Sequence, residues 1–377
     1  MKHLQQNLER TLAELVSIPS DSYDPEACRR IISYIHEQLT PLGLYVTADL
    51  TGDHPWLVAT TRQTMRPKLL LVAHVDVVAA SGGQFEMRTD EEKLYGRGVW
   101  DMKYAAAVYL EYLKDNAEHL AALDIGVMFT TDEETGGFDG VRLLLEQGWR
   151  TSLALIPDYR DHWTIEEMAK GLRIKQLTAR GNGAHGSRPW ETVNPIDSLM
   201  TVGAELKALY PSDAMYGPTL SITNFNAGKF VSQIPSSASM TLDFRAFEQD
   251  EIELYETTLL DMTRSYGLEV TDLAYGAPVH LDSNHPMVMD YVKALLDSGV
   301  APRYQKSLGA TDARWFAEHH IPCIVTGPSG HGAHSDNEWI YRRDLVFFYH
   351  LLTNYVAQTG RISTASVVAT PVDTSVS

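Results

Sequence analysis

Five short segments of the sequence carry the histidines and acids from which a metal centre could be built. Each places an imidazole or a carboxylate beside the end of an expected strand or beside a glycine turn. Imidazole and oxygen ligands without cysteine suit zinc, cobalt or manganese in a hydrolytic site. The segments are AHVDVV (73–78), GRGVWDMK (96–103), TTDEETGG (130–137), IPDYR (156–160) and GHGAHSDNE (330–338).

The first two segments each have a local explanation that needs no metal. An H-x-D pair such as His74 and Asp76 is usually a surface or core polar contact. Here, however, the pair follows an apolar run that predicts a buried strand, where an unpaired imidazole would be costly. Metal-bound histidines commonly donate their second ring proton to a carboxylate, so we expect His74 to be a ligand and Asp76 to orient it. Asp101 follows a glycine turn and precedes a helix, where aspartate is also a good N-cap.

The remaining segments add a spare carboxylate. Glu133 and Glu134 follow an apolar strand, where two adjacent acids repel each other unless a cation is present. With metal bound, one can hold the ion while the other accepts a proton from water. Asp158 alone could be a turn residue, and His331 and His334 share one glycine-rich loop. The metal hypothesis therefore depends on the set rather than on any member.

The segments lie in a chain of alternating strands and helices. Apolar runs at 69–73, 125–130 and 153–156 predict strands buried on both faces, and each ends at one of the acidic or histidine segments. Ligands bind at the carboxyl ends of such strands. We predict an α/β fold, a mostly parallel mixed sheet with helices on both faces. The helices expected here are 4–16, 102–114, 285–298, 311–319 and 341–357, with a further strand at 322–327.

The pattern changes between residues 172 and 273. Strands are expected at 172–180, 218–225, 237–245 and 268–273, with helices from 194 to about 209 and at 249–266. This β-α-β-β-α-β order predicts an inserted α+β domain of the ferredoxin-like type. We therefore expect a discontinuous catalytic domain (1–171 and 280–360), an inserted domain (172–279) and a disordered tail (361–377).

Composition limits the partners. The chain has 377 residues and a net charge of -18, from 31 basic and 49 acidic side chains. That balance disfavours binding to nucleic acids or anionic membranes, which need concentrated positive charge. The start of the chain has no apolar signal core, and no apolar run approaches membrane-spanning length. With only Cys28 and Cys323, far apart, we expect a reducing, cytoplasmic location.

Taken in order, the motifs resemble the M20 family of zinc metallopeptidases and amidohydrolases. The order is a strand followed by H-x-D, then GRG-x-x-DMK, DEE-x-G, a lone acid and H-S-x-x-E, and it covers nearly the whole chain. The family includes acetylornithine deacetylases, succinyl-diaminopimelate desuccinylases, aminoacylases, glutamate carboxypeptidases and carnosinase-type dipeptidases. The resemblance is specific for the family and says much less about the subfamily.

The resemblance implies two zinc ions, with cobalt or manganese as alternatives, in half-sites that share one carboxylate. Glu133 is implied to be the general base and later the proton donor. His334 is preferred to His331 because it directly precedes Ser335 and the motif's Glu338. The implied ligands are Asp101, shared by both ions, His74 with Asp158 at one ion, and Glu134 with His334 at the other.

The inserted domain resembles the family's lid and dimerisation domain. Its segment GNGAHGSRPWE (181–191) matches the lid histidine motif, so His185 is implied to stabilise the oxyanion, supplied by the partner subunit in dimeric members. A homodimer through this lid is therefore expected. The implied substrate-binding residues are Lys170, Ser232, Arg245, Thr311 and Arg314.

Departures from the family pattern bear on the substrate. Several deacylases have asparagine at the position of Ser232 and arginine at that of Lys170, and Asp158 in place of glutamate tends to accompany peptidases. We therefore expect hydrolysis of an amide bond in a dipeptide or N-acyl amino acid, with some preference against acetylornithine and succinyl-diaminopimelate. The alternatives are a deacylase of that type, an aminopeptidase acting on longer peptides and a non-catalytic metal-binding relative.

Overall fold

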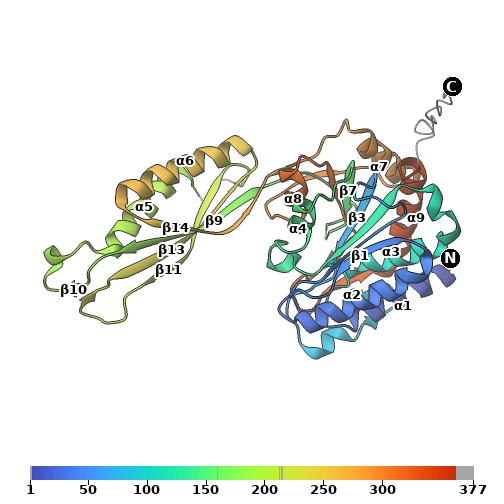
Figure 1. Cartoon of the computed structure of the whole chain (residues 1–377), viewed down its shortest axis with the longest axis horizontal. Coiled ribbons are helices and arrows are strands. Elements are labelled where there is room, and N and C mark those ends of the chain that lie inside the picture. Colours follow the sequence, from blue (N-terminus) through green and yellow to red (C-terminus); the bar gives the residue numbers. More distant parts are fainter. Residues whose placement is uncertain (1, 159, 212, 214, 362–377) are drawn as a thin grey trace, which may run out of the picture.

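The computed structural model describes residues 2–361 except 159, 212 and 214. It has two lobes, a large body and an elongated second lobe that extends from it (Figure 1). The second lobe, called the lid lobe below, runs from the first residue of β9 to the last of β14, residues 171–276. The body contains the chain before and after this insertion. The tail expected to be disordered lies, from residue 362, outside the described residues.

The body is organised on one mixed sheet. Its strand order is β1-β2-β6-β3-β7-β17, and β6, β3, β7 and β17 are parallel to one another. At one edge of the sheet, β1 pairs antiparallel with β2, and β2 pairs antiparallel with β6. The strands are β1 (Tyr45–Asp49), β2 (Trp56–Thr60), β3 (Leu69–His74), β6 (Ile125–Thr130), β7 (Leu153–Ile156) and β17 (Cys323–Val325). This arrangement confirms the predicted mostly parallel mixed sheet.

Helices cover both faces of this sheet. Alternate side chains of β3 enter different cores, with Leu69 and Leu71 in one and Leu70 and Val72 in the other. Burying each such side chain contributes roughly 1.5–3 kcal/mol, so the all-apolar run is stable only with both faces covered. One core contains residues of α1 (Lys2–Val16), α2 (Pro25–Leu39), α3 (Lys103–Asp115), α7 (Pro286–Asp297) and α9 (Arg342–Thr359). The other contains residues of α4 (Val141–Glu146) and α8 (Ala313–Glu318).

The lid lobe is a four-stranded antiparallel sheet with two helices. The strand order β11-β13-β9-β14, with α5 and α6 on one face (Figure 1), is the predicted ferredoxin-like arrangement. Its core is separate from those of the body and lies between the helices and the sheet. The elements are β9 (Gly171–Arg180), α5 (Pro195–Leu209), β11 (Thr219–Ala227), β13 (Ser237–Ala246), α6 (Gln249–Tyr266) and β14 (Glu269–Gly276).

Three small sheets complete the described chain. One joins β15 (Val279–His280), β8 (Ile165–Ala169) and β16 (Tyr304–Ser307) beside the base of the lid lobe. A second orders β18 (Gly330–His331), β19 (Trp339–Tyr341), β5 (Lys93–Tyr95) and β4 (Arg88–Thr89). The third pairs β10 (Ala184–His185) with β12 (Gln233–Ile234). Among the described residues, no helix is long and apolar enough to cross a membrane.

Candidate active site

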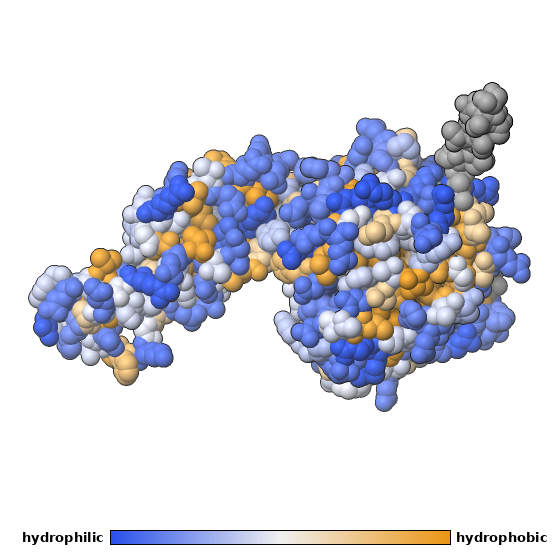
Figure 2. All heavy atoms as spheres, viewed as in Figure 1, coloured by the Kyte–Doolittle hydropathy of each residue, from blue (hydrophilic) through white to orange (hydrophobic). Residues whose placement is uncertain are grey.

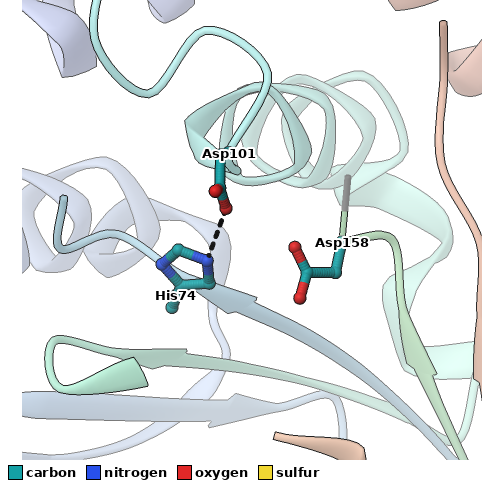
Figure 3. A group of neighbouring side chains, drawn as sticks. All are labelled: His74, Asp101 and Asp158. Atoms are coloured by element: carbon teal, nitrogen blue, oxygen red, sulfur yellow. Dashed lines mark hydrogen bonds and ion pairs between the residues drawn. The ribbon is translucent and has the colours of Figure 1, made fainter. Parts of the chain in front are cut away.

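The parallel strands of the body bring the predicted metal ligands to one edge of the sheet. His74 is the last residue of β3, and Glu133 and Glu134 follow β6. Asp158 follows β7, and Asp101 lies in the loop before α3. Figure 3 shows the side chains of His74, Asp101 and Asp158 converging from these separate elements. Because parallel strands end at a common edge, residues distant in the sequence become neighbours.

One cluster of possible ligands consists of His74, Asp101 and Asp158. Their ligand atoms lie within 4.8 Å of one another, and all three residues are buried. His74 Nε2 is 3.2 Å from Asp101 Oδ1, while its Nδ1 is 3.4 Å from Asp76 Oδ1. Asp76 is held in turn by the Ser22 hydroxyl, 2.7 Å from its Oδ2. One ring nitrogen of His74 therefore faces the cluster and the other faces an acid that fixes the ring.

A second cluster consists of Asp101, Glu134 and His334, so Asp101 belongs to both. His334 Nε2 lies 3.2 Å from Asp101 Oδ2 and 2.9 Å from Glu134 Oε2. His334 has a φ of 61°, a left-handed conformation that is uncommon for a residue other than glycine and occurs often at functional sites. His331, the alternative in the sequence, instead pairs with Trp339 in the small sheet.

The charges of the two clusters fit divalent cations. Burial would raise the pKa of Asp101, but hydrogen bonds from His334 and His74 lower it to about 2. Asp101 and Glu134 in turn raise the pKa of His334 to about 10. Burial alone would lower the pKa of His74, but Asp101 and Asp76 raise it well above the ordinary value. Without metal, both histidines therefore favour the protonated form between carboxylates. Divalent ions can take the place of those protons and supply more positive charge among the carboxylates, and the ligands are the nitrogen and oxygen donors such ions take.

Glu133 differs from its neighbour Glu134. Burial, with the nearby charges of Asp158, Asp312 and Glu134, raises its pKa well above the ordinary value. Its carboxylate makes no hydrogen bond or ion pair with any other side chain in the described part of the chain, whereas Glu134 is paired with His334. Glu133 also lines the cavity beside the two clusters. It is therefore free to exchange a proton with a molecule bound there.

This cavity lies where the lid lobe leaves the body. It has a volume of about 290 Å³, and its wall combines the metal-ligand candidates with residues of the lid strands. Figure 2 shows the surface hollowed between the two lobes. The lid-lobe residues in the wall are Leu172, Ile174, Arg245 and Ala274. A volume of this size, bounded by both lobes, suits a small substrate rather than a folded protein.

Three of the predicted substrate-binding residues, Thr311, Arg314 and Arg245, line this cavity. The Arg314 guanidinium donates a hydrogen bond to the Gly136 carbonyl and lies over the Trp315 ring. Arg245 is held by the carboxylate of Asp243, with Nε and NH2 at 2.9 and 3.1 Å from its two oxygens. Both guanidinium groups thus have defined positions at the cavity wall.

The other predicted residues of the lid region lie elsewhere. Lys170 is buried, and its ammonium group donates to the Gly217 carbonyl at 2.7 Å without lining the cavity. His185 is on β10, and Figure 1 places this strand at the end of the lid lobe farthest from the body. Ser232 lies beside it, its carbonyl accepting a hydrogen bond from Gly186 N. A single chain therefore does not bring His185 or Ser232 to the metal-ligand clusters.

The predictions missed one residue that organises the site. Glu338 is 1% exposed, and its carboxylate accepts four hydrogen bonds from the loop that ends at Asp101. The donors are Arg97 NH1 and Gly98 N at 3.0 Å, Trp100 N at 2.9 Å and Asp101 N at 3.1 Å. Its place in the H-S-x-x-E motif was a signal, but only the fold reveals that it holds the loop that carries the ligand candidate Asp101.

Comparison with known proteins identifies the family of this chain. The model of the family described as peptidase family M20/M25/M40 matches residues 70–358. The chain is 26% identical over 370 residues to a succinyl-diaminopimelate desuccinylase of Delftia acidovorans, covering 90% of this chain and 95% of that protein. It also resembles a tripeptidase structure from Staphylococcus aureus (TM-score 0.78, 20% identity, 94% and 98% covered). A metallo-carboxypeptidase structure from Sulfolobus solfataricus gives a TM-score of 0.75 at 19% identity, covering 93% and 98%. The chain therefore belongs to peptidase family M20/M25/M40 and is a hydrolase that cleaves amide bonds with the aid of divalent metal ions.

Proposed function

We propose that this enzyme hydrolyses the amide bond of a dipeptide or an N-acyl amino acid with two zinc ions, cobalt or manganese being the alternatives. One observation carries the proposal. Two ligand clusters that share Asp101 border a small cavity, and the unpaired carboxylate of Glu133 lines the same cavity. This arrangement provides two metal positions and a separate acid–base group, a combination suited to the hydrolysis of an amide.

The metal positions divide among five side chains. We assign Asp101 as the shared ligand, with Asp76 orienting His74 through its Nδ1. When bound, the metal ions supply Lewis-acid polarisation of the amide carbonyl and activation of water near neutral pH. His74 and Asp158 would hold one ion, and Glu134 and His334 the other, each pair together with Asp101.

Glu133 is assigned the proton transfers. Its carboxylate removes a proton from the attacking water, and the same group then donates that proton to the nitrogen of the departing amine. Its raised pKa, caused first by burial, favours holding the proton between the two steps.

His185 is assigned to stabilise the oxyanion from a partner subunit. Its position far from the body, exposed at the end of the lid lobe, supports this assignment, because its own active site is out of reach. The same end carries exposed apolar side chains, including Trp190, Phe230 and Val231. Apolar surface of this kind is typical of an interface, and we propose a homodimer formed through the lid lobe.

Two observations bear on the substrate. Arg245 and Arg314 line the cavity and provide guanidinium groups suited to a free carboxylate, which dipeptides and N-acyl amino acids both carry. The similarity to a desuccinylase favours a deacylase as the second candidate. A hydrolysis panel of dipeptides and N-acyl amino acids, each with zinc, cobalt or manganese, separates the two.

We further propose a cytoplasmic location, because both cysteines are buried free thiols.

The central test is Glu133→Gln. We expect kcat to fall by about 10²–10⁴-fold, the usual contribution of a general acid–base group, while the metal content stays at the wild-type value. Metal is measured by mass spectrometry and activity on the best substrate of the panel. Glu167→Gln, at an exposed glutamate of β8, is the matched control. A Glu133→Gln protein with wild-type activity would refute the assignment of the base.

A further inference from the structure

A second cavity in the body is larger than the active-site cavity and is not used by the reaction. Its volume is about 880 Å³. It is formed where the first half of α9 meets the loop that follows α7 and the segment that follows Asp158. Its lining includes His162, Trp163, Val300, Arg303, Ser329, Arg343, Asp344, Val346, Phe347 and His350.

The wall combines free positive charge with an apolar surface. Neither Arg303 nor Arg343 forms an ion pair with any carboxylate among the described residues, although the chain as a whole carries a charge of -18. The acid in the wall, Asp344, is largely buried and accepts a hydrogen bond from Ser329 N at 3.2 Å. The Arg343 guanidinium lies over the Tyr341 ring, 4.4 Å from its centroid. Two guanidinium groups without a carboxylate partner, beside apolar side chains, suit an anion with an apolar body.

One edge of the cavity has an unusual backbone. His162 and Trp163 have φ values of 51° and 58°, so two successive residues other than glycine are in the left-handed region. Ser329 Oγ lies 3.1 Å from the backbone nitrogen of His162 and 2.8 Å from its ring Nδ1. The backbone N–H of Trp163 donates a hydrogen bond to the Gly327 carbonyl at 2.7 Å. These contacts hold both residues in place. Such conformations are uncommon for residues other than glycine and cluster at ligand sites and switch regions.

The same edge is joined to both halves of the metal centre. His162 lies four residues after Asp158, and Ser329 lies five residues before His334. A Cβ at Gly327 would stand 2.2 Å from the Asp158 carbonyl, so the two segments touch at their backbones. A ligand that shifts residues 162, 163 or 329 would therefore act on the positions of two metal-ligand candidates.

We propose that this cavity is a regulatory site for a small carboxylate with an apolar body, the class of acid that amide hydrolysis releases. Arg303 and Arg343 receive the carboxylate, and Trp163, Val346 and Phe347 contact the apolar part. Binding lowers turnover through the segments that carry Asp158 and His334. The inference goes beyond the proposed function, because it assigns a second ligand site away from the catalytic cavity.

The test uses the metal-loaded enzyme and 3-phenylpropionate as the probe. We expect calorimetry to give a Kd of about 1 mM or below, and steady-state kinetics to show a lower kcat with KM unchanged. The double variant Arg303→Ala/Arg343→Ala should weaken binding at least about tenfold, since each charge-assisted hydrogen bond is worth that factor or more. Its activity without the probe should stay at the wild-type value.

Two controls make the result decisive. The variant Arg10→Ala/Arg264→Ala removes the same charge from exposed sites elsewhere and should bind the probe as the wild type does. The neutral amide 3-phenylpropanamide should bind at least about tenfold more weakly. Absence of probe binding, purely competitive inhibition that persists in the cavity variant, or equal binding of the amide would each overturn the proposal. Calorimetry does not require a known substrate, so this failure is distinguishable from failure of the proposed function.

Discussion

The body and the lid lobe place their functional side chains in opposite ways. In the body, His74 and Asp101 are 2% and 4% exposed, and both are fixed by neighbouring acids and histidines. In the lid lobe, His185 is exposed, and its ring contacts only the nearby Ser187 among the described side chains. One chain thus brings the candidate metal ligands together by itself, whereas the proposed oxyanion group lies on β10, at the far end of the lid lobe. Changes in the two lobes should therefore have different signatures.

The largest effect is expected in the body, for Asp101→Ala. Asp101 belongs to both ligand clusters, so its loss should weaken both metal sites together. We expect the affinity to fall by more than the about 10–100-fold that removal of a supporting partner costs, with activity at background. Metal titration by calorimetry measures this. The backbone N–H of residue 101 still reaches Glu338, so the melting temperature of the metal-free protein controls for misfolding.

Retention of one tightly bound metal by Asp101→Ala would contradict a shared ligand. It would assign the two clusters as independent sites, and the geometry around His74 and His334 would need another explanation.

The next effect is expected at the far end of the lid lobe, for His185→Ala. Loss of one oxyanion donor costs about 10²–10³-fold in kcat, and metal content should not change because the histidine is remote from the ligands. Mixing His185→Ala with Glu133→Gln subunits should restore about a quarter of wild-type activity, since about half of randomly exchanged dimers are mixed and each has one complete site. Activity of the mixture and its molar mass by light scattering are measured.

The control for this mixing experiment is the double variant Glu133→Gln/His185→Ala in place of Glu133→Gln. It has no intact histidine to offer, so its mixture with His185→Ala should remain inactive. Recovery with the double variant, or no recovery with the single variant, would exclude a contribution from the partner.

A smaller effect is expected for Glu338→Gln, in the body. The amide keeps one acceptor for Trp100 N and Asp101 N but turns a donor toward Arg97 and Gly98 N. We expect metal affinity to fall about 10–100-fold, with kcat near the wild-type value once the metal is saturating. Glu92→Gln, at an exposed acid, is the control. Unchanged metal affinity would mean that Glu338 only stabilises the fold.

Much of the body could be predicted because its candidate site residues lie at or just after the ends of apolar strands in the sequence. Apolar runs ending in His74 or Asp158 predict buried strands with polar groups at one edge, and parallel strands bring those ends together. The βαββαβ pattern likewise predicted the lid lobe. The predictions omit α2, although Asp24 before Pro25 is a clear helix start, and Asp24 Oδ1 does accept a bond from Ala27 N.

Other features depend on distances that no local pattern contains. The order β1-β2-β6-β3-β7-β17 is a property of the folded sheet, and so is the contact between Glu338 and the loop of Asp101. Lys170 and Arg245 are both basic residues near strand ends, yet only Arg245 lines the cavity. The reason is that the Gly217 carbonyl binds the ammonium group of Lys170. Tertiary packing, rather than a local sequence pattern, determines which of these two residues lines the cavity.

The smallest effect is expected where the two lobes meet, for Arg245→Ala. Arg245 is the lid-lobe cation in the cavity wall, held by Asp243 and only half-buried. If it binds the substrate carboxylate in both ground and transition states, KM should rise about tenfold while kcat changes little. A substrate analogue with a carboxamide in place of the carboxylate should show no such difference between wild type and variant. Arg264→Ala, an exposed arginine on α6, controls for the loss of charge. An equal KM increase for the carboxamide would mean that Arg245 shapes the cavity wall without contacting the carboxylate. The base of the lid lobe would then offer the substrate no direct contact through Arg245, just as the far end of the lobe offers none within a single chain.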